Sequence, residues 1–241
     1  MNDAIRQELA PTGTLRAGIN MSNFLLVSSR GPNDEPRGVS PDMAAHIAGL
    51  LGVPLALVPF PRPGALADAV DDNVWDIGLI GAEPQRAEKI AFSAAYAEIE
   101  ATYMVPAASP ITVIADVDKK GNRIAVTGRS AYGLWLENNI KNAELVRSDS
   151  LDASFIDFTT KKLEALAGLR PRLIDDVKKV PGARILDGQF SAVQQAVGTP
   201  KKNAKAAAYL HKFVENAKAS GLVQSFIDKH KVVGLTVAPK A

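Results

Sequence analysis

Short apolar runs alternate with amphipathic segments along the first half of the chain. A short apolar run predicts a buried strand, and apolar positions three or four residues apart predict a helix. Because strands and helices alternate, the pattern predicts an α/β fold whose sheet is mainly parallel and covered on both faces. The expected strands cover residues 15–19, 55–60, 74–80 and 101–105, and the expected helices cover residues 41–52, 64–72 and 84–91.

The same alternation begins again after residues 106–110, which contain two prolines. A segment with this composition does not continue a helix and favours an extended chain. The restart therefore predicts a second lobe, and the chain is expected to return to the first lobe along residues 189–199. The expected strands of this half are 123–127, a strand near 145 and 163–169, and the expected helices are 130–138, 152–160, 171–180, 201–220 and 222–231.

Two crossings between lobes define the expected domains. Lobe 1 comprises residues 1–105 with 196–241, and lobe 2, residues 106–195, is inserted into it. The hinge segments lie near 105–110 and 189–198, and two antiparallel crossings would let the lobes close on a ligand like a Venus flytrap. The alternative is that residues 106–110 form an ordinary surface loop within one domain.

Charge and composition exclude several classes of protein. The net charge is +2, from 28 basic and 26 acidic residues, and the basic residues are scattered, so nucleic acid is not an expected partner. The chain has no cysteine, which excludes disulfides. Its three histidines, His46, His211 and His230, lack the spacing of metal ligands, so neither a metal site nor a cofactor is expected.

The sequence has no segment suited to the membrane. It contains no apolar stretch of the length that spans a bilayer, so the chain is not expected to be membrane-inserted. Residues 1–8 lack the apolar core of a secretory signal. Two alternatives stay open, namely a signal removed from the mature protein or a cytoplasmic location.

Arg86 occupies a position suited to binding an anion. It follows the apolar residues Ile77, Leu79 and Ile80, which are expected to form a buried strand, and Pro84 suits the first turn of a helix. The carboxyl end of a strand and the amino end of a helix present free N–H groups to ligands. A guanidinium adds a fork of donors that matches a carboxylate. The alternative is a solvated arginine on the surface.

Four motifs in order along the chain resemble one family. They are the strand 15–20, the helix start 38–44, the segment 84–96 with Pro84-Gln85-Arg86 and Phe92-Ser93, and the strand and glycine turn 123–130. Together they resemble the family 3 solute-binding proteins, the amino-acid-binding receptors of bacterial ABC importers. The resemblance implies a two-lobed fold of the type II periplasmic-binding-protein kind, with two parallel-rich sheets joined by two hinge crossings. It also implies a periplasmic monomer that works with an ABC permease.

The resemblance assigns roles to residues of both lobes. Arg86 and a hydroxyl of Ser130 or Thr127 would hold the carboxylate of an amino acid. Arg129 would either reach a second acidic group or point to solvent. The expected ligand-binding residues are Asn20, Asn23, Phe24, Gly81, Ala82, Arg86, Thr127, Gly128, Arg129, Ser130, Tyr132 and Leu169.

Three departures from the family pattern concern the ammonium of an amino acid. Asn20 and Asn23 stand in the region where the family places an aspartate, and Leu169 stands at the position of a second acidic residue. Burying an ammonium without a carboxylate costs several kcal/mol. The sequence therefore predicts a ligand with a carboxylate and no ammonium: a keto acid, hydroxy acid, aromatic acid or acylated amino acid. Phe24, Phe60 and Tyr132 would line its apolar part or, alternatively, belong to the core.

The sequence predicts a binding protein and not an enzyme. A dehydratase on this fold is the first alternative, and it would need an acid or base in the site. The carboxylates expected nearby are Glu83, which would cap the helix at Pro84, and Glu164, at the start of a strand. The second alternative is a cytoplasmic small-molecule sensor of the same fold.

Overall fold

A computed structural model describes residues 3–241 of the chain. The structure divides into two compact units, one up to Glu98 together with Gln194–Ala241 and the other Ile99–Val193. The helices are α1 (Asp3–Leu9), α2 (Val39–Leu51), α3 (Pro63–Asp68), α4 (Ala131–Asn139), α5 (Leu151–Thr160), α6 (Arg170–Val177), α7 (Ala204–Ala219) and α8 (Leu222–Lys229), with 3-10 turns η1 (Ala69–Asp71), η2 (Arg86–Glu88) and η3 (Ile114–Asp116).

Most strands belong to one mixed sheet in the order β4-β1-β5-β11-β6-β9-β7-β8, with β10 and β12 also paired to β6, while β2 and β3 form a separate pair. The expectation of two separate parallel-rich sheets is therefore wrong. The reason is that β6 and β11, which carry the chain from one unit to the other, are themselves paired strands. The strands are β1 (Leu15–Asn20), β2 (Ser29–Arg30), β3 (Pro36–Arg37), β4 (Leu55–Phe60), β5 (Ile77–Gly81), β6 (Ile90–Val105), β7 (Arg123–Thr127), β8 (Glu144–Ser148), β9 (Ala165–Leu169), β10 (Arg184–Ile185), β11 (Ser191–Pro200) and β12 (Thr236–Val237).

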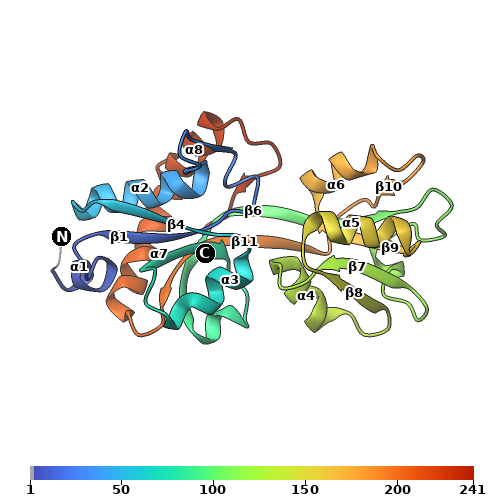
Figure 1. Cartoon of the computed structure of the whole chain (residues 1–241), viewed down its shortest axis with the longest axis horizontal. Coiled ribbons are helices and arrows are strands. Elements are labelled where there is room, and N and C mark those ends of the chain that lie inside the picture. Colours follow the sequence, from blue (N-terminus) through green and yellow to red (C-terminus); the bar gives the residue numbers. More distant parts are fainter. Residues whose placement is uncertain (1–2) are drawn as a thin grey trace. The chain divides into compact units, whose positions relative to one another are not determined.

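The first unit is built around β1, which pairs in parallel with β4 on one side and β5 on the other. Figure 1 shows α2 on one side of these strands and α3 on the other. Helix α3 packs closely against the sheet at Gly78, where an added Cβ atom would come within 2.8 Å of the Leu66 side chain. Leu66 and Trp75 are fully buried there, and the indole N–H of Trp75 donates to the Leu66 carbonyl oxygen.

The segment after Arg86 differs from the expected helix 84–91. Only one 3-10 turn forms, Arg86–Glu88, and the sixteen-residue strand β6 begins at Ile90, so the expected strand 101–105 is merely its end. The helix prediction failed because β11 binds this segment instead. The backbone N–H of Val197 donates to the Ser93 hydroxyl, and that of Lys201 donates to the Lys89 carbonyl.

The second unit repeats the parallel arrangement, with β7 between β8 and β9. Its core gathers side chains from β6, β7, β9 and the helices α5 and α6, namely Met104, Ala125, Phe158, Leu163, Leu166 and Leu173. Residues 106–110 belong to this unit, since the first passage between units falls within β6, after Glu98. Arg184 fixes the loop by donating to the carbonyl oxygens of Ser109 and Ile111.

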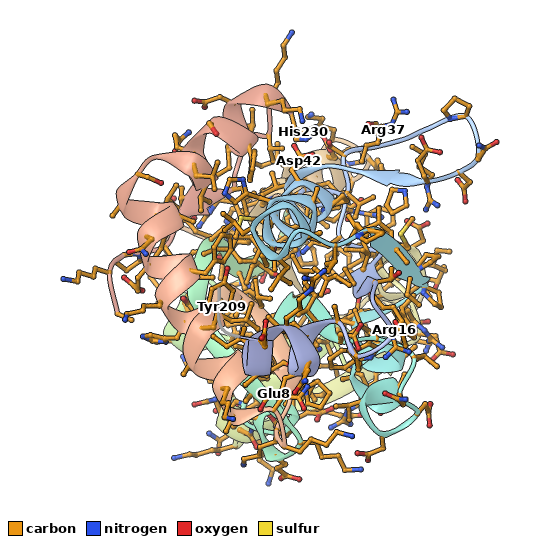
Figure 2. The ribbon with its side chains drawn as sticks, turned by 90° about the vertical axis from the view of Figure 1, so that its left-hand side faces the viewer. Glu8, Arg16, Arg37, Asp42, Tyr209 and His230 are labelled. Carbon is orange, nitrogen blue, oxygen red and sulfur yellow. The ribbon has the colours of Figure 1, made fainter. Side chains whose placement is uncertain are left out.

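Helices near the two ends of the chain are fixed within the first unit. Glu8 of α1 accepts a hydrogen bond from the backbone N–H of Ala206, in the first turn of α7, at 2.8 Å. Nearer the carboxyl end, the Asp42 carboxylate of α2 contacts Nε2 of His230 at 2.8 Å, and Figure 2 shows these two side chains close together. The same carboxylate contacts Nζ of Lys229 at 2.8 Å. Among residues 3–241, no helix is both long and apolar enough to cross a membrane.

Candidate ligand-binding site

Arg86 lies on a tight turn at the end of β5. The Glu83 carbonyl oxygen accepts from the backbone N–H groups of Arg86 and Ala87, at 3.0 and 2.9 Å, and this closes the turn. The Arg86 side chain is only 6% exposed, and its Nη1 donates to the carbonyl oxygen of Gly81 at 2.7 Å. The guanidinium is therefore held at the end of the strand and is not a solvated surface group.

Glu83, on the same turn, carries an unusual carboxyl group. It is partly buried. Burial raises the pKa of Glu83 to about 7, and the positive charge of Arg86 opposes that rise. The expectation that Glu83 caps a helix at Pro84 is wrong, because the 3-10 turn starts two residues later and no side chain caps it. Among the described residues, the buried Oε1 of Gln85 also has no partner.

A second polar pair lies beside this turn and was not found by sequence reasoning. The backbone N–H of Ala82 donates to the carbonyl oxygen of Gln194 at 2.8 Å, so β11 runs next to the end of β5. The Gln194 side chain in turn donates from Nε2 to the Glu98 carboxylate at 2.9 Å. Glu98 was missed because the strand that carries it was expected to begin only at residue 101.

Asn20 and Asn23 shape the loop after β1. The Asn20 side-chain oxygen accepts from the N–H and the hydroxyl of Ser22, and that of Asn23 accepts from the N–H of Leu25. The oxygen of each amide is thus used within the loop, which leaves the NH₂ groups as donors. Phe24, which follows Asn23, is 37% exposed. By contrast, Phe60 packs against the core cluster that contains Leu66.

In the second unit, the hydroxyl groups of the turn after β7 are already used. Ser130 Oγ donates to the Thr127 carbonyl oxygen at 2.7 Å and accepts from the N–H of Gly133, as the N-cap of α4. Ser154 Oγ donates to Leu151, so in its 3.1 Å contact with Thr127 the threonine must donate. Both hydroxyls therefore form hydrogen bonds within the unit, and their expected role at a ligand carboxylate stays a prediction.

The donors that remain at this turn belong to the backbone. The N–H groups of Ala131 and Tyr132 open α4 and have no partner among the described residues. Arg129 is exposed and has a positive φ of 58°, and Gly128 precedes it. A helix N-terminus with free N–H groups favours an anion.

Tyr132 and Leu169 complete the predicted set in the second unit. The Tyr132 hydroxyl is buried beside Thr127 and Ser130, and burial raises its pKa. Leu169 ends β9 and is 8% exposed, and the next residue, Arg170, donates from Nε to Glu100 at 2.5 Å. Leu169 therefore offers no acceptor to an ammonium group.

Glu164, the second carboxylate considered for acid or base chemistry, has a structural role. It accepts from the backbone N–H, Nε and Nη2 of Arg123, at distances between 2.8 and 3.0 Å. The hydrogen bond from the Arg123 side chain lowers the pKa of Glu164. A carboxylate engaged in this way is poorly suited to take up a proton from a substrate. Among residues 3–241, no group of three His, Asp or Glu side chains could hold a metal ion.

Comparisons with known proteins cover nearly the whole chain. The L-cystine-binding protein TcyJ of Escherichia coli (strain K12) is 23% identical over 205 residues, which cover 84% of this chain and 76% of that protein. A mutant of ArgBP from T. maritima has a similar structure, with a TM-score of 0.73 and 21% identity over 95% of this chain and 99% of the other. The Cysteine-Binding Protein from Campylobacter jejuni gives a TM-score of 0.73 with 18% identity, covering 95% of this chain and 93% of the other.

The family is shown by a match that spans both units. Residues 15–232 match the family described as bacterial extracellular solute-binding proteins, family 3. This range includes every residue of the candidate site, from Asn20 to Leu169. The chain therefore belongs to the bacterial extracellular solute-binding proteins of family 3.

Proposed function

We propose that this chain captures a small carboxylate-bearing solute for an ABC-type importer, without catalysing a reaction on it. The observation that carries the proposal is the buried guanidinium of Arg86, 6% exposed and oriented by the Gly81 carbonyl at the end of a strand. A guanidinium held in this way matches a carboxylate in a two-point contact. The free NH₂ groups of Asn20 and Asn23 add donors from the same unit.

The second unit contributes donors from its backbone in this proposal. The Thr127 and Ser130 hydroxyls form hydrogen bonds within the second unit. The N–H groups of Ala131 and Tyr132 at the start of α4 are therefore the groups proposed to meet a negatively charged ligand. The roles of Gly81, Ala82, Gly128, Arg129 and Leu169, and the division into two closing lobes, stay predictions.

The proposed ligand has no ammonium group. Leu169 is apolar, and the asparagines present donors where an ammonium would need acceptors. Two acidic side chains of the first unit do not change this inference. Glu98 already accepts from Gln194, and Glu83, with a pKa of about 7, is not a fixed negative charge at neutral pH. The classes that fit are keto acids, hydroxy acids, aromatic acids and acylated amino acids.

Relatives that bind amino acids supply the competing ligands for a test. The names of two similar proteins give L-cystine and cysteine as what they bind. Location outside the cytoplasm and delivery to a permease are proposed on the family's description as extracellular.

Calorimetry with matched pairs of ligands tests the proposal. Pyruvate is compared with L-alanine, and phenylpyruvate with L-phenylalanine, with L-cystine and L-arginine as further probes. The proposal expects the acid of a pair to bind at least ten times more tightly than the amino acid. An amino acid that binds more tightly than its keto acid would overturn the ligand class.

A further inference from the structure

The peptide group between Gly81 and Ala82 connects Arg86 to strand β11. Its carbonyl oxygen accepts from Nη1 of Arg86 at 2.7 Å, and its N–H donates to the carbonyl oxygen of Gln194 at 2.8 Å. A trans peptide directs its C=O and its N–H to opposite sides. One bond therefore holds the guanidinium and the other holds the same peptide against β11, so the orientation of the guanidinium depends on that of the peptide.

The hydrogen bond from Ala82 to Gln194 lies where the pairing of β5 with β11 ends. Gly81 is the last residue of β5, and its partner on β11 is Gln195. Hydrogen bonds at the end of a ladder open more readily than those within it. A side-chain contact that fixes β11 at this place would therefore have a direct effect on the peptide that holds Arg86.

The Gln194 side chain forms such a contact. Its Nε2 donates to Oε1 of Glu98 at 2.9 Å. Glu98 is itself fixed, because β12 pairs with β6 at Thr236 and Glu98, and the Thr236 hydroxyl donates to the Glu98 carbonyl oxygen at 3.4 Å. A continuous series of hydrogen bonds thus runs from β12 through Glu98 and Gln194 to Arg86, and all of these residues belong to the first unit.

We propose that Gln194 and Glu98 are positioning residues for Arg86. They fix the end of β11, and through the Gly81–Ala82 peptide they hold the guanidinium in the orientation that receives a ligand carboxylate. This inference rests on the proposed function. In this role Glu98 acts as a hydrogen-bond acceptor for Gln194 and not through its charge, so a neutral amide at position 98 should replace it.

Calorimetry tests the role of the acceptor. Pyruvate, lactate, phenylpyruvate and N-acetyl-L-alanine are titrated, and the tightest binder is used with each variant. E98A should weaken binding about three- to tenfold, the usual contribution of one hydrogen bond. E98Q, whose amide oxygen can still accept from Gln194, should bind like the wild type. Q194A breaks the same contact, so Q194A and the E98A/Q194A double variant should match E98A.

Glu100 provides a matched control. It lies two residues further along β6, and its carboxylate accepts from Nε of Arg170 in the second unit. E100A removes the same side chain from the same strand and should leave the affinity unchanged. Two results would overturn the proposal, namely E98Q binding as weakly as E98A, which would mean that Glu98 acts through its charge, and E100A binding as weakly as E98A.

A second measurement needs no ligand. NMR of the arginine side-chain nitrogens identifies the Arg86 signals as those missing from Arg86→Lys. Because the Gly81 carbonyl oxygen holds Nη1, rotation about the Nε–Cζ bond should be slow and give separate Nη1 and Nη2 signals in the wild type and in E98Q. The two signals should merge in Q194A and E98A at the same temperature. Signals that stay separate in a folded Q194A or E98A protein would overturn the proposal.

The failure of this inference can be told from the failure of the proposed function. A carboxylate that binds equally to the wild type, Q194A and E98A removes the positioning role and leaves the proposed ligand class intact. If none of the four acids binds to the wild type, the proposed function is overturned. The NMR comparison then still decides whether Glu98 and Gln194 hold the Arg86 guanidinium.

Discussion

Nη1 of Arg86 donates to the carbonyl oxygen of Gly81 at 2.7 Å, across the turn that ends β5. This contact fixes the orientation of a side chain that would otherwise have many rotamers, and lost rotamer freedom otherwise opposes binding. The position of the guanidinium is therefore set before a ligand arrives.

Replacement of Arg86 should remove most of the affinity for a carboxylate. We expect Arg86→Ala to weaken binding by about 2 to 5 kcal/mol, the usual loss when one partner of a buried charge pair is removed. Arg86→Lys should lose less, because it keeps the charge but not the planar fork. Calorimetry with the tightest-binding acid measures the loss. Arg30→Ala, in an exposed ion pair with Asp34, is the control and should bind like the wild type.

Glu83 should make the stability of the free protein depend on pH. The pKa of Glu83 is raised from 4.5 to about 7 in the folded state. Between these values the unfolded chain loses its proton while the folded chain keeps it, so the wild type becomes less stable as pH rises from about 4.5 to about 7. The full shift would amount to roughly 3 kcal/mol, and solvent screening of a partly exposed carboxyl reduces it to about 1 to 2 kcal/mol.

Urea denaturation of E83Q and the wild type at pH 4.5, 6 and 8 measures this difference. The advantage of E83Q over the wild type should grow up to pH 7 and then stay constant. An advantage that shrinks as pH rises would mean that the folded state stabilises the charged form of Glu83.

Helix α7 should depend on Glu8 for its N-terminal cap. Asn203 at the N-cap forms no capping hydrogen bond to the helix, and Glu8 Oε2 instead accepts from the Ala206 N–H at 2.8 Å. We expect Glu8→Ala to lower the free energy of unfolding by about 1 kcal/mol, the usual effect of a lost cap. Glu88→Ala, at an exposed position, should change it by less than about 0.5 kcal/mol. Equal effects of the two substitutions in urea denaturation would show that Glu8 is no cap.

Gly133 should be essential to the turn that opens α4. An added Cβ would lie 2.6 Å from the Thr127 carbonyl oxygen and 2.8 Å from Ser130 Oγ, so the turn would have to shift. We expect Gly133→Ala to destabilise the protein by about 2 kcal/mol and to weaken ligand binding. Gly49→Ala, in α2 with open space around it, should instead stabilise by about 0.5 to 1 kcal/mol. Thermal unfolding of both variants tests the contrast, and a stable Gly133→Ala protein with unchanged affinity would contradict it.

The regular elements could be predicted where a short pattern determined them. The strand at 55–60 and the helix that begins at residue 222 follow from local periodicity. The expected helix 84–91 was wrong because β6 begins at Ile90 and pairs with β11, about a hundred residues away in sequence. The single mixed sheet could not be predicted for a similar reason, since it depends on the pairing of β6 with β11.

The candidate site shows the same limit. Arg86 could be found because a local pattern of strand, glycine and proline precedes it. The contact of Glu98 with Gln194 joins residues 96 positions apart, and the hydrogen bond between the Thr127 and Ser154 hydroxyls joins residues 27 positions apart. Local sequence contains no signal for either contact.

The most direct test of the account compares an acid with its neutral ester. Phenylpyruvate and methyl phenylpyruvate have the same apolar part, and only the acid offers a carboxylate to Arg86. If phenylpyruvate is bound, the account predicts that the ester binds at least a hundred times more weakly to the wild type, and that Arg86→Ala binds both equally weakly. Equal affinity of the wild-type protein for the acid and the ester would contradict the claim that this chain recognises its ligand through a carboxylate.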